Sequence, residues 1–185
     1  GNIRKLGRVD NQDAFLDTYE LEKKRGITIF SKQALMQWKD CRITLLDTPG
    51  HVDFSAEMER VLKILDYAVL VINGADGVQG HTRTLWKLLQ RYEIPVFLFI
   101  NKMDQVGTDR QQRMIELQQQ LSGNCIDFGM DQDHQQFLEE LAVCDEIVLE
   151  RYLQEGTVEE QEIRQMIWDR KVFPCYFGAA LRIDG

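Results

Sequence analysis

One stretch of the sequence combines residue types that could bind a cation and a phosphate group. Asp47–His51 reads Asp-Thr-Pro-Gly-His and follows a short apolar run. Open α/β sheets bind ligands where their strands end, so this turn is expected at a ligand site. Asp47 suits a hard cation such as Mg²⁺, Gly50 lets a backbone N–H approach a phosphate, and His51 could orient a water molecule. An ordinary turn is the alternative, because Pro-Gly marks a turn by itself.

A second stretch could recognise a base. Asn101–Asp104 reads Asn-Lys-Met-Asp and directly follows the apolar run 96–100. Asp104 can accept two hydrogen bonds from N1–H and the exocyclic amine of guanine, a donor pair that adenine lacks. Asn101 would hold the loop or accept from the base, and the stem of Lys102 can cover the face of the base. The alternative is a polar loop between a strand and a helix.

Hydrophobic periodicity predicts the elements that must position these residues. Continuous apolar runs are typical of buried parallel strands, and here they alternate with helical stripes, which indicates a parallel, doubly wound sheet. Two further strands near the start are joined by a tight turn. The expected strands are 33–39, 42–46, 69–72, 96–100 and 172–177.

Residues 124–171 are predicted to form an insert before the last strand. The first dozen residues of the insert read as a loop, and the helical pattern that follows is interrupted near Cys144 and stops at Gly156. Thr157 and Glu160 form a capping box for the last helix. We find no chemistry in this insert, so a scaffold is the preferred interpretation.

Composition predicts a single globular domain with a substantial core. The formal net charge of −8 argues against a broad nucleic-acid surface and against sequence-specific DNA binding. It leaves room for ribosome binding through a local patch or another domain. The four cysteines are far apart and are expected to be reduced and mostly buried. Neither metal-ligand spacing, a signal peptide nor a membrane span is visible, so we expect a cytoplasmic protein without membrane contact.

The motifs together resemble those of the translational GTPases. Arg25–Thr28, which reads Arg-Gly-Ile-Thr, precedes Asp47–His51 and Asn101–Asp104 in the order and at about the spacing of that family. The sequence around the motifs is most similar to that of the tetracycline-resistance ribosomal protection proteins, close relatives of elongation factor G. The resemblance covers nearly all of the 185 residues.

This resemblance implies a fold and cofactors. The fold would be an α/β, three-layer P-loop NTPase-type G domain, with a mostly parallel sheet, one antiparallel edge strand and the helical insert. Residues 1–185 would form one truncated GTP-binding domain without its first strand and phosphate loop. GTP or GDP and Mg²⁺ would be its ligands, and the full-length protein would bind the ribosome.

The resemblance also implies roles for the residues near the phosphates. Thr28 and Asp47 would bind Mg²⁺ and sense the γ-phosphate, and Gly50 would give it a backbone donor. His51 would be the catalytic residue, which positions the attacking water or stabilises the transition state once the ribosome orders it. Three apolar neighbours are candidates to gate this histidine: Ile27, Pro49 and Val52.

On the base side, the resemblance assigns Asn101–Asp104 to guanine and the loop after the last strand to guanine O6. In the family this loop usually reads Ser-Ala-Leu or Ser-Ala-Lys, and here the three positions are Ala179, Ala180 and Leu181. Ala179 removes a hydroxyl that would brace the loop. The backbone contact of Ala180 need not change.

The sequence contains no Gly-x-x-x-x-Gly-Lys-Ser/Thr motif, which the family carries just upstream of the matching region. We expect the chain to be part of a longer protein whose missing strand lies between strands 42–46 and 68–73. That motif supplies much of the electrostatic stabilisation in phosphoryl transfer. These residues alone should therefore bind nucleotide weakly and hydrolyse little GTP.

The predicted function is the GTP-binding domain of a ribosomal protection factor, which hydrolyses GTP on the ribosome and releases tetracycline from it. One alternative is an elongation factor G-type translocation factor, which shares every motif discussed. The other is a non-catalytic remnant that acts as an interaction module. The absent phosphate loop favours the remnant, whereas three intact motifs argue against it.

Overall fold

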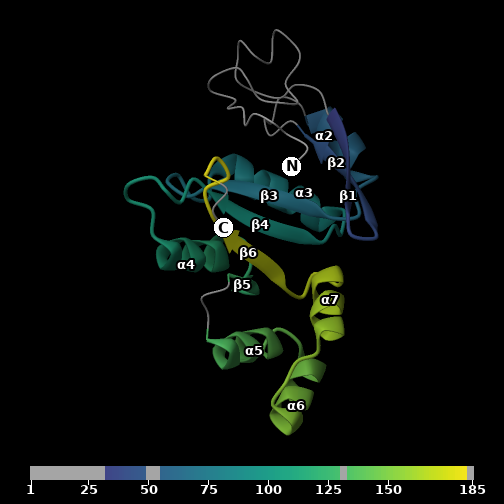
Figure 1. Ribbon diagram of the computed structural model, residues 1–185. Helices are drawn as coiled ribbons and strands as arrows, with labels where there is room; N and C mark the ends of the chain where they lie inside the picture. The colour runs from purple at the N-terminus through teal and green to yellow at the C-terminus, as the bar shows by residue number, and fades with distance from the viewer. Residues whose placement is uncertain (1–31, 49–54, 130–132, 183–185) are drawn as a thin grey trace. The chain divides into compact units, whose positions relative to one another are not determined.

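The computed structural model describes residues 32–48, 55–129 and 133–182. The chain divides into two compact units, 1–65 and 66–185, and each is described by itself. Their elements are labelled in Figure 1. Within the described residues, the structure contains no helix that is both long and apolar enough to cross a membrane.

The first unit contains an antiparallel hairpin and a helix. Strands β1 (Lys32–Trp38) and β2 (Cys41–Asp47) pair along their whole length, within one residue of the predicted strands. Lys39 begins the turn between them with a φ of 50°, in the left-handed region. Helix α2 (Ser55–Leu62) follows. Its described apolar side chains, which are all buried, are Met58, Val61 and Leu62.

The second unit is built on a four-stranded parallel sheet. Across the sheet the strands are β3 (Ala68–Asn73), β4 (Val96–Asn101), β6 (Phe173–Phe177) and β5 (Cys125–Asp127). The helices along the chain are α3 (Gly80–Arg91), α4 (Arg110–Gln120), α5 (His134–Ala142), α6 (Glu146–Glu155) and α7 (Glu160–Trp168). Strands β2 and β3 belong to different sheets. A mostly parallel sheet together with an antiparallel pair confirms the predicted α/β fold class.

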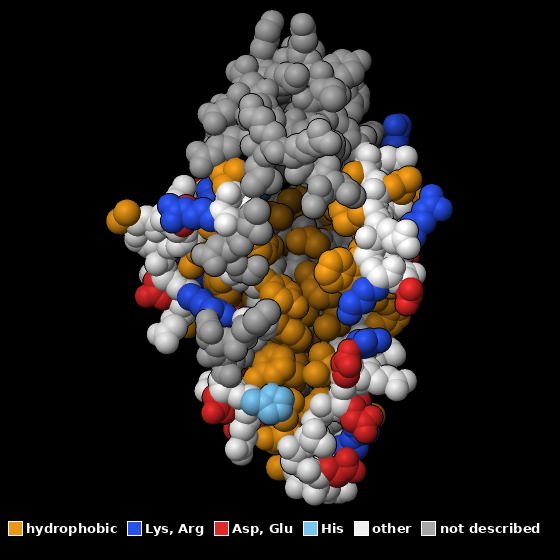
Figure 2. All heavy atoms as spheres, viewed as in Figure 1, with side chains coloured by type: hydrophobic (Ala, Val, Ile, Leu, Met, Phe, Trp, Pro, Cys, Tyr) orange, Lys and Arg blue, Asp and Glu red, His pale blue; other side chains and the backbone are white. Residues whose placement is uncertain are grey.

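Strand β4 is one of the two inner strands of the sheet, because it pairs with β3 on one side and β6 on the other. Its alternate side chains Val96, Leu98 and Ile100 are fully buried. On the opposite face, Val69 and Val71 of β3 are 63% and 59% exposed. Figure 2 shows hydrophobic side chains gathered over β4 and β6 on the face turned to the viewer.

The predicted insert contains a strand as well as helices. The loop predicted over its first dozen residues is wrong in part, since Cys125–Asp127 forms β5 and pairs in parallel with β6. Three residues are too few to show a period, and Cys125 and Ile126 are both buried, so no alternation marks the strand. The predicted interruption near Cys144 is confirmed by the gap between α5 and α6. Gly156 ends α6 with a φ of 70°.

The capping box predicted at Thr157 and Glu160 is wrong by two residues. Helix α7 begins after Glu159, and the Glu162 carboxylate accepts a hydrogen bond from the Glu159 N–H at 2.9 Å. Val158 is buried in the core of the insert. Because that anchor fixes the chain just before the helix, the helix starts later than the sequence pattern indicates.

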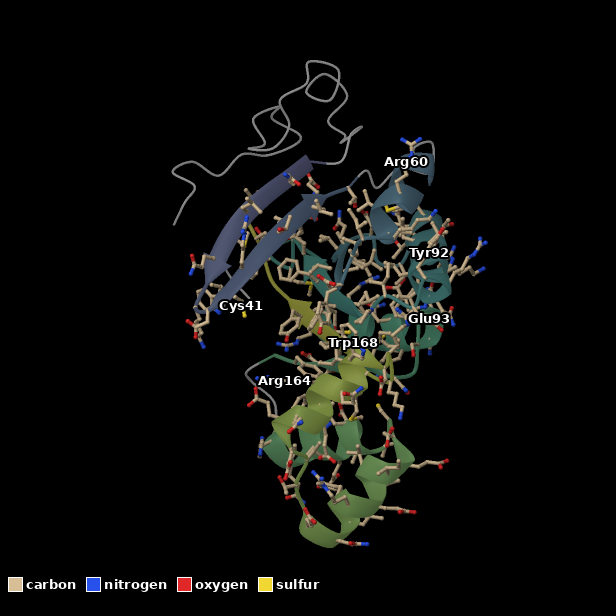
Figure 3. All side chains as sticks on the ribbon, turned by 90° about the vertical axis from the view of Figure 1, so that its right-hand side faces the viewer. Cys41, Arg60, Tyr92, Glu93, Arg164 and Trp168 are labelled. Atoms are coloured by element: carbon tan, nitrogen blue, oxygen red, sulfur yellow. The ribbon has the colours of Figure 1, made fainter. Side chains whose placement is uncertain are left out.

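The four cysteines are free thiols, as expected. Cys125 and Cys175 are buried, Cys144 is half-buried, and Cys41 is exposed at the end of the hairpin (Figure 3). Burial raises the pKa of the Cys144 thiol to about 11, so this thiol stays protonated at neutral pH.

A buried carboxylate joins the insert to the strand that returns to the sheet. Asp145 caps α6 by accepting hydrogen bonds from the N–H groups of Ile147 at 2.9 Å and Val148 at 3.1 Å. It also accepts a charged hydrogen bond from Lys171, two residues before β6. That bond is the largest cause of the lowering of the Asp145 pKa below its ordinary 3.8. Asp145 therefore fixes the start of α6 and the approach to β6 together.

We expect Asp145→Ala to lower the free energy of unfolding by about 1–2 kcal/mol at neutral pH, because it removes a helix cap. Asp145→Asn keeps a capping side chain but loses the ion pair, so its loss should be smaller. Urea unfolding at several pH values measures both. A lowered folded pKa means that the charge-dependent stability is present above pH 3.8 and is lost as the pH falls through the folded pKa.

The matched control is Asp133→Asn, which changes an exposed aspartate that caps α5 in the same way. It should leave stability nearly unchanged. A difference in the free energy of unfolding between wild type and Asp145→Asn that stayed constant as the pH was lowered below 3.8 would contradict this role of the Asp145 charge.

Candidate functional site

Three parallel strands end together at one edge of the sheet. The strand register sets Asn73 of β3 opposite Asn101 of β4, and Ile100 opposite Phe177 of β6. The predicted base-recognition stretch Asn101–Asp104 begins at this edge, and the loop after β6 leaves from the same place. Ligands of parallel α/β sheets bind at such carboxyl ends.

The side chain of Asn101 holds the two loops together. Its Oδ1 accepts hydrogen bonds from the N–H of Lys102 at 2.8 Å and from the N–H of Ala180 at 3.0 Å. Both partners are N–H donors, so the amide must present its oxygen to them. These contacts brace the loop, which is one of the two roles predicted for Asn101, and its contact with a base stays a prediction.

Backbone hydrogen bonds reinforce this junction. The Gly178 N–H donates to the Ile100 carbonyl, and the Met103 N–H donates to the Gly178 carbonyl, both at 3.0 Å. Lys102 lies between these contacts with a φ of 62°. A non-glycine residue in this region costs about 1–2 kcal/mol, which the surrounding hydrogen bonds offset. The chain thus turns sharply as it leaves β4 and brings Asp104 beside the second loop.

The loop after β3 packs against Asn101 and Met103. The Gly74 N–H donates to the Asn101 carbonyl at 2.8 Å. A Cβ atom at Gly74 would lie 2.6 Å from the Met103 sulfur and 3.1 Å from the Asn101 carbonyl oxygen. A larger residue at position 74 would therefore displace the Met103 side chain and crowd the Asn101 carbonyl. On the other side, the Thr108 hydroxyl donates to the Met103 carbonyl at 2.8 Å.

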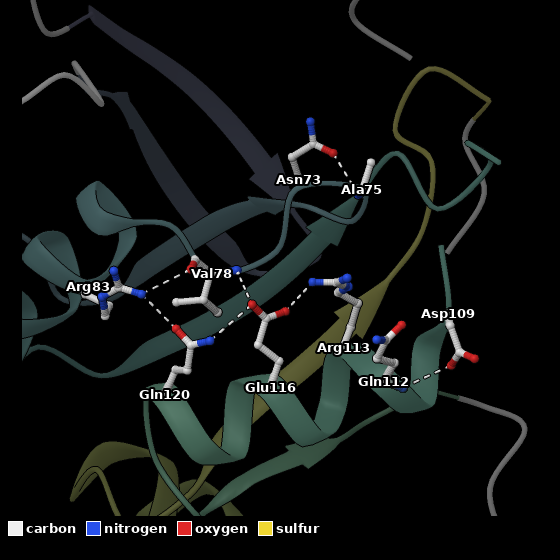
Figure 4. Close-up of polar contacts among 9 residues, drawn as sticks. All are labelled: Asn73, Ala75, Val78, Arg83, Asp109, Gln112, Arg113, Glu116 and Gln120. Carbon is white, nitrogen blue, oxygen red and sulfur yellow. Dashed lines mark hydrogen bonds and ion pairs between the residues drawn. The ribbon is translucent and has the colours of Figure 1, made fainter. Parts of the chain in front are cut away.

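A polar network then fixes the loop after β3 to helix α4 (Figure 4). The Val78 N–H donates to Glu116 Oε1 at 3.0 Å, and Arg113 pairs with the same carboxylate. Arg83 of α3 donates to Gln120 of α4 at 2.8 Å. Sequence reasoning missed the contacts of Val78 with Glu116 and of Arg83 with Gln120, since these partners are 38 and 37 residues apart and carry no motif.

Asp104 has a partner that the sequence analysis did not identify. Its Oδ2 forms an ion pair with Arg182 Nε at 3.0 Å, with the Arg182 side chain 68% exposed and the Asp104 side chain 29% exposed. The Arg182 N–H donates to the Ala179 carbonyl at 2.8 Å, which closes a turn. Ala179 is buried and Leu181 is 40% exposed. The loop is braced by Asn101 and this turn, without the hydroxyl that Ala179 lacks.

Of the residues predicted to act at the phosphates and Mg²⁺, only Asp47 lies within the described residues. Asp47 ends β2 in the first unit and is half-buried. Thr28, Gly50 and His51 lie outside the described residues. The same holds for the candidate gating residues Ile27, Pro49 and Val52. Within the described residues, no group of three His, Cys, Asp or Glu side chains could hold a metal ion. The structure therefore assembles the base side of the predicted site and leaves the phosphate side as a prediction.

A cavity of about 620 Å³ lies elsewhere, between α4 and α5. Its polar lining includes Arg110 and Asp127, which form an ion pair at 2.6 Å. None of the predicted site residues lines it. We place the functional site at the strand edge, because the potential hydrogen-bonding groups for a base converge there.

Comparisons with known proteins show the family to which the chain belongs. A family model described as the elongation factor Tu GTP binding domain matches residues 1–185. Elongation factor G of Mycoplasma genitalium is 36% identical over 176 residues, which are 93% of this chain and 25% of that protein. Elongation factor G 2 of Borreliella burgdorferi is 46% identical over 109 residues, 59% of this chain and 16% of that protein. The chain thus spans a quarter or less of these relatives.

A solved structure of a protein from Thermus thermophilus has a similar fold. It is 20% identical and matches with a TM-score of 0.81, covering 98% of this chain and 34% of that protein's chain. At this identity the likeness concerns the fold alone.

The junction at Asn101 makes a testable prediction. Asn101→Ala should speed hydrogen exchange at the Ala180 amide by about 5-fold, since a typical hydrogen bond contributes about 1 kcal/mol. Asn101→Asp keeps an acceptor of the same size and should preserve protection. NMR-detected exchange measures both, with the Gly178 amide as internal reference. Unchanged exchange at Ala180 in the alanine variant would show that Asn101 does not brace the loop.

Proposed function

Since the chain belongs to the family of elongation factor Tu GTP binding domains, we propose that it is the GTP-binding domain of a longer translational GTPase. In this proposal, residues 1–185 act as one domain, and the whole protein hydrolyses GTP on the ribosome. The observation that carries the proposal is the junction at Asn101, which brings Asp104 and Ala180 to one sheet edge.

The base side has the chemistry that guanine requires. Guanine presents an N1–H and an amine to an acceptor, and the two oxygens of Asp104 can accept both. Its O6 needs a donor, which the Ala180 N–H can supply while it also faces Asn101 Oδ1. Adenine offers neither the donor pair nor the carbonyl, so the same groups would be left unpaired. The Lys102 stem would cover the face of the base.

The phosphate side of the proposal rests on the sequence motifs. Thr28 and Asp47 would hold Mg²⁺, because hydroxyl and carboxylate oxygens are ligands that this ion accepts. When bound, Mg²⁺ would neutralise charge that develops on the phosphate oxygens. Gly50 would donate its backbone N–H to the γ-phosphate. His51 would orient the attacking water once the ribosome has ordered the surrounding loop.

For the step of translation in which the whole protein acts, translocation by an elongation factor G-type factor is the best supported. The curated relatives reported above are all named elongation factor G. Ribosomal protection against tetracycline, which the sequence around the motifs predicts, is the second candidate function. The two activities separate in one assay with purified ribosomes, which follows tRNA–mRNA movement and tetracycline release in parallel.

Guanine selectivity tests the base side. In the full-length protein, Asp104→Ala should weaken GDP binding by about 100-fold or more, because two hydrogen bonds to a charged group are lost at about 1.5 kcal/mol each. Competition with fluorescent GDP measures this, and ADP should compete poorly with the wild type. Asp169→Ala, at the end of α7, is a remote acidic control. If Asp104→Ala bound GDP as tightly as the wild type, the proposed function would fall.

Ribosome-stimulated turnover tests the catalytic residue. His51→Ala should lower the stimulated rate of GTP hydrolysis by about 100-fold or more, in the range of a positioned acid–base group. GDP affinity should stay within about 2-fold, since His51 is not proposed to contact the nucleotide in the ground state. His134→Ala, at the start of α5, is the matched control. Full ribosome-stimulated activity in His51→Ala would remove His51 from the mechanism and favour an interaction module.

A further inference from the structure

The carboxylate that would read guanine already has a partner within the protein. Arg182 Nε lies 3.0 Å from Asp104 Oδ2, and the two residues come from different loops at the same sheet edge. This contact joins the loop after β4 to the loop after β6 a second time, close to the junction made by Asn101 and Ala180.

The arginine is held there by its own backbone. The Arg182 N–H donates to the Ala179 carbonyl at 2.8 Å, and Ala179 is buried. The turn is anchored on its other side by the hydrogen bond from Ala180 to Asn101. The base of the Arg182 side chain is therefore fixed beside Asp104, whereas the side chain as a whole is 68% exposed and its guanidinium can move away.

Both protein groups that would bind guanine are thus already engaged. Asp104 forms an ion pair with Arg182, and the Ala180 N–H donates to Asn101. The Ala180 N–H can share its hydrogen between two acceptors at the cost of a longer bond. The contact between Arg182 and Asp104 is different, because the guanidinium would occupy space and an acceptor that the exocyclic amine of guanine needs.

We propose that Arg182 is a specificity-determining residue that competes with the guanine base for the Asp104 carboxylate. This inference rests on the proposed function, since it takes Asp104 as the acceptor for guanine. Arg182 neutralises Asp104 when no base is present. The base must displace the guanidinium before both carboxylate oxygens are available, so Arg182 lowers guanine affinity in the wild type.

The contact between Arg182 and Asp104 should affect the affinities for different bases to different extents. Guanine needs two acceptors, one for N1–H and one for its amine. Hypoxanthine has the N1–H but no amine, so it needs only one carboxylate oxygen. Arg182 engages Oδ2, which leaves Oδ1 for hypoxanthine. Removal of Arg182 should therefore favour GDP over inosine diphosphate, two ligands that have the same phosphates and ribose.

The experiment uses the full-length protein with Mg²⁺ and measures displacement of fluorescent GDP by unlabelled GDP and by inosine diphosphate. Arg182→Ala and Arg182→Gln should each raise the ratio of GDP affinity to inosine diphosphate affinity by about 2- to 5-fold, the range expected for an exposed ion pair. The ratio cancels any general effect of the lost charge on phosphate binding.

The matched control is Arg164→Ala on α7 (Figure 3), which removes an equally charged, 75% exposed arginine that pairs with Glu160. It should leave the ratio unchanged. Because Arg182 is exposed, thermal unfolding of its variants should match that of the wild type. An unchanged or lowered ratio in both Arg182 variants would overturn the inference.

Asp104→Ala separates failure of this inference from failure of the proposed function. If Asp104→Ala loses GDP binding and the Arg182 variants leave the ratio unchanged, the guanine site stands and only the competition is wrong. If Asp104→Ala keeps GDP binding, the proposed function fails and this inference fails with it. In Asp104→Ala, a further change at Arg182 should have no effect on the ratio.

Discussion

The hydrogen bond between Asn101 Oδ1 and the Ala180 N–H is the contact on which the candidate site depends. It joins two loops whose residues are 79 positions apart in the chain. The loops can meet only because β4 and β6 are direct neighbours in a parallel sheet and end at the same edge. The sheet order thus sets where the loops leave, and the amide oxygen of Asn101 sets how they face each other.

The insert serves this arrangement because it leads the chain from β5 to the start of β6, which lies between β4 and β5 in the sheet. Its core buries apolar residues of α5, α6 and α7 together with Ile126 of β5 and Val172, which directly precedes β6. Arg170 adds a second anchor, since its guanidinium lies 5.6 Å from the ring of Trp86 and 5.2 Å from that of Phe173. Burial lowers the pKa of Arg170, but the side chain retains a hydrogen bond to the Ile94 carbonyl. Helices α5, α6 and α7, which carry no predicted site residue, therefore help to hold β6 beside β4.

The strands of the sheet centre could be predicted because long apolar runs leave few alternatives for buried segments. Strand β5 could not, since three buried residues have no period, and the start of α7 moved because Val158 is held in a core that the sequence does not show. Asp104 and Asn101 were found from their motif. Arg182 and the Glu116 network were missed because long-range polar partners leave no local pattern. Thr28, Gly50 and His51 lie outside the described residues and stay predictions.

If Asp104 reads the base, a change of its side chain should reverse which base the protein prefers. Asn at this position would present an amide donor, which suits the 2-carbonyl of xanthine and opposes the amine of guanine. We would measure the affinities of GDP and xanthosine diphosphate for the full-length protein and for Asp104→Asn. We expect the wild type to prefer GDP and the variant to prefer xanthosine diphosphate. A variant that still preferred GDP would show that the base is read elsewhere.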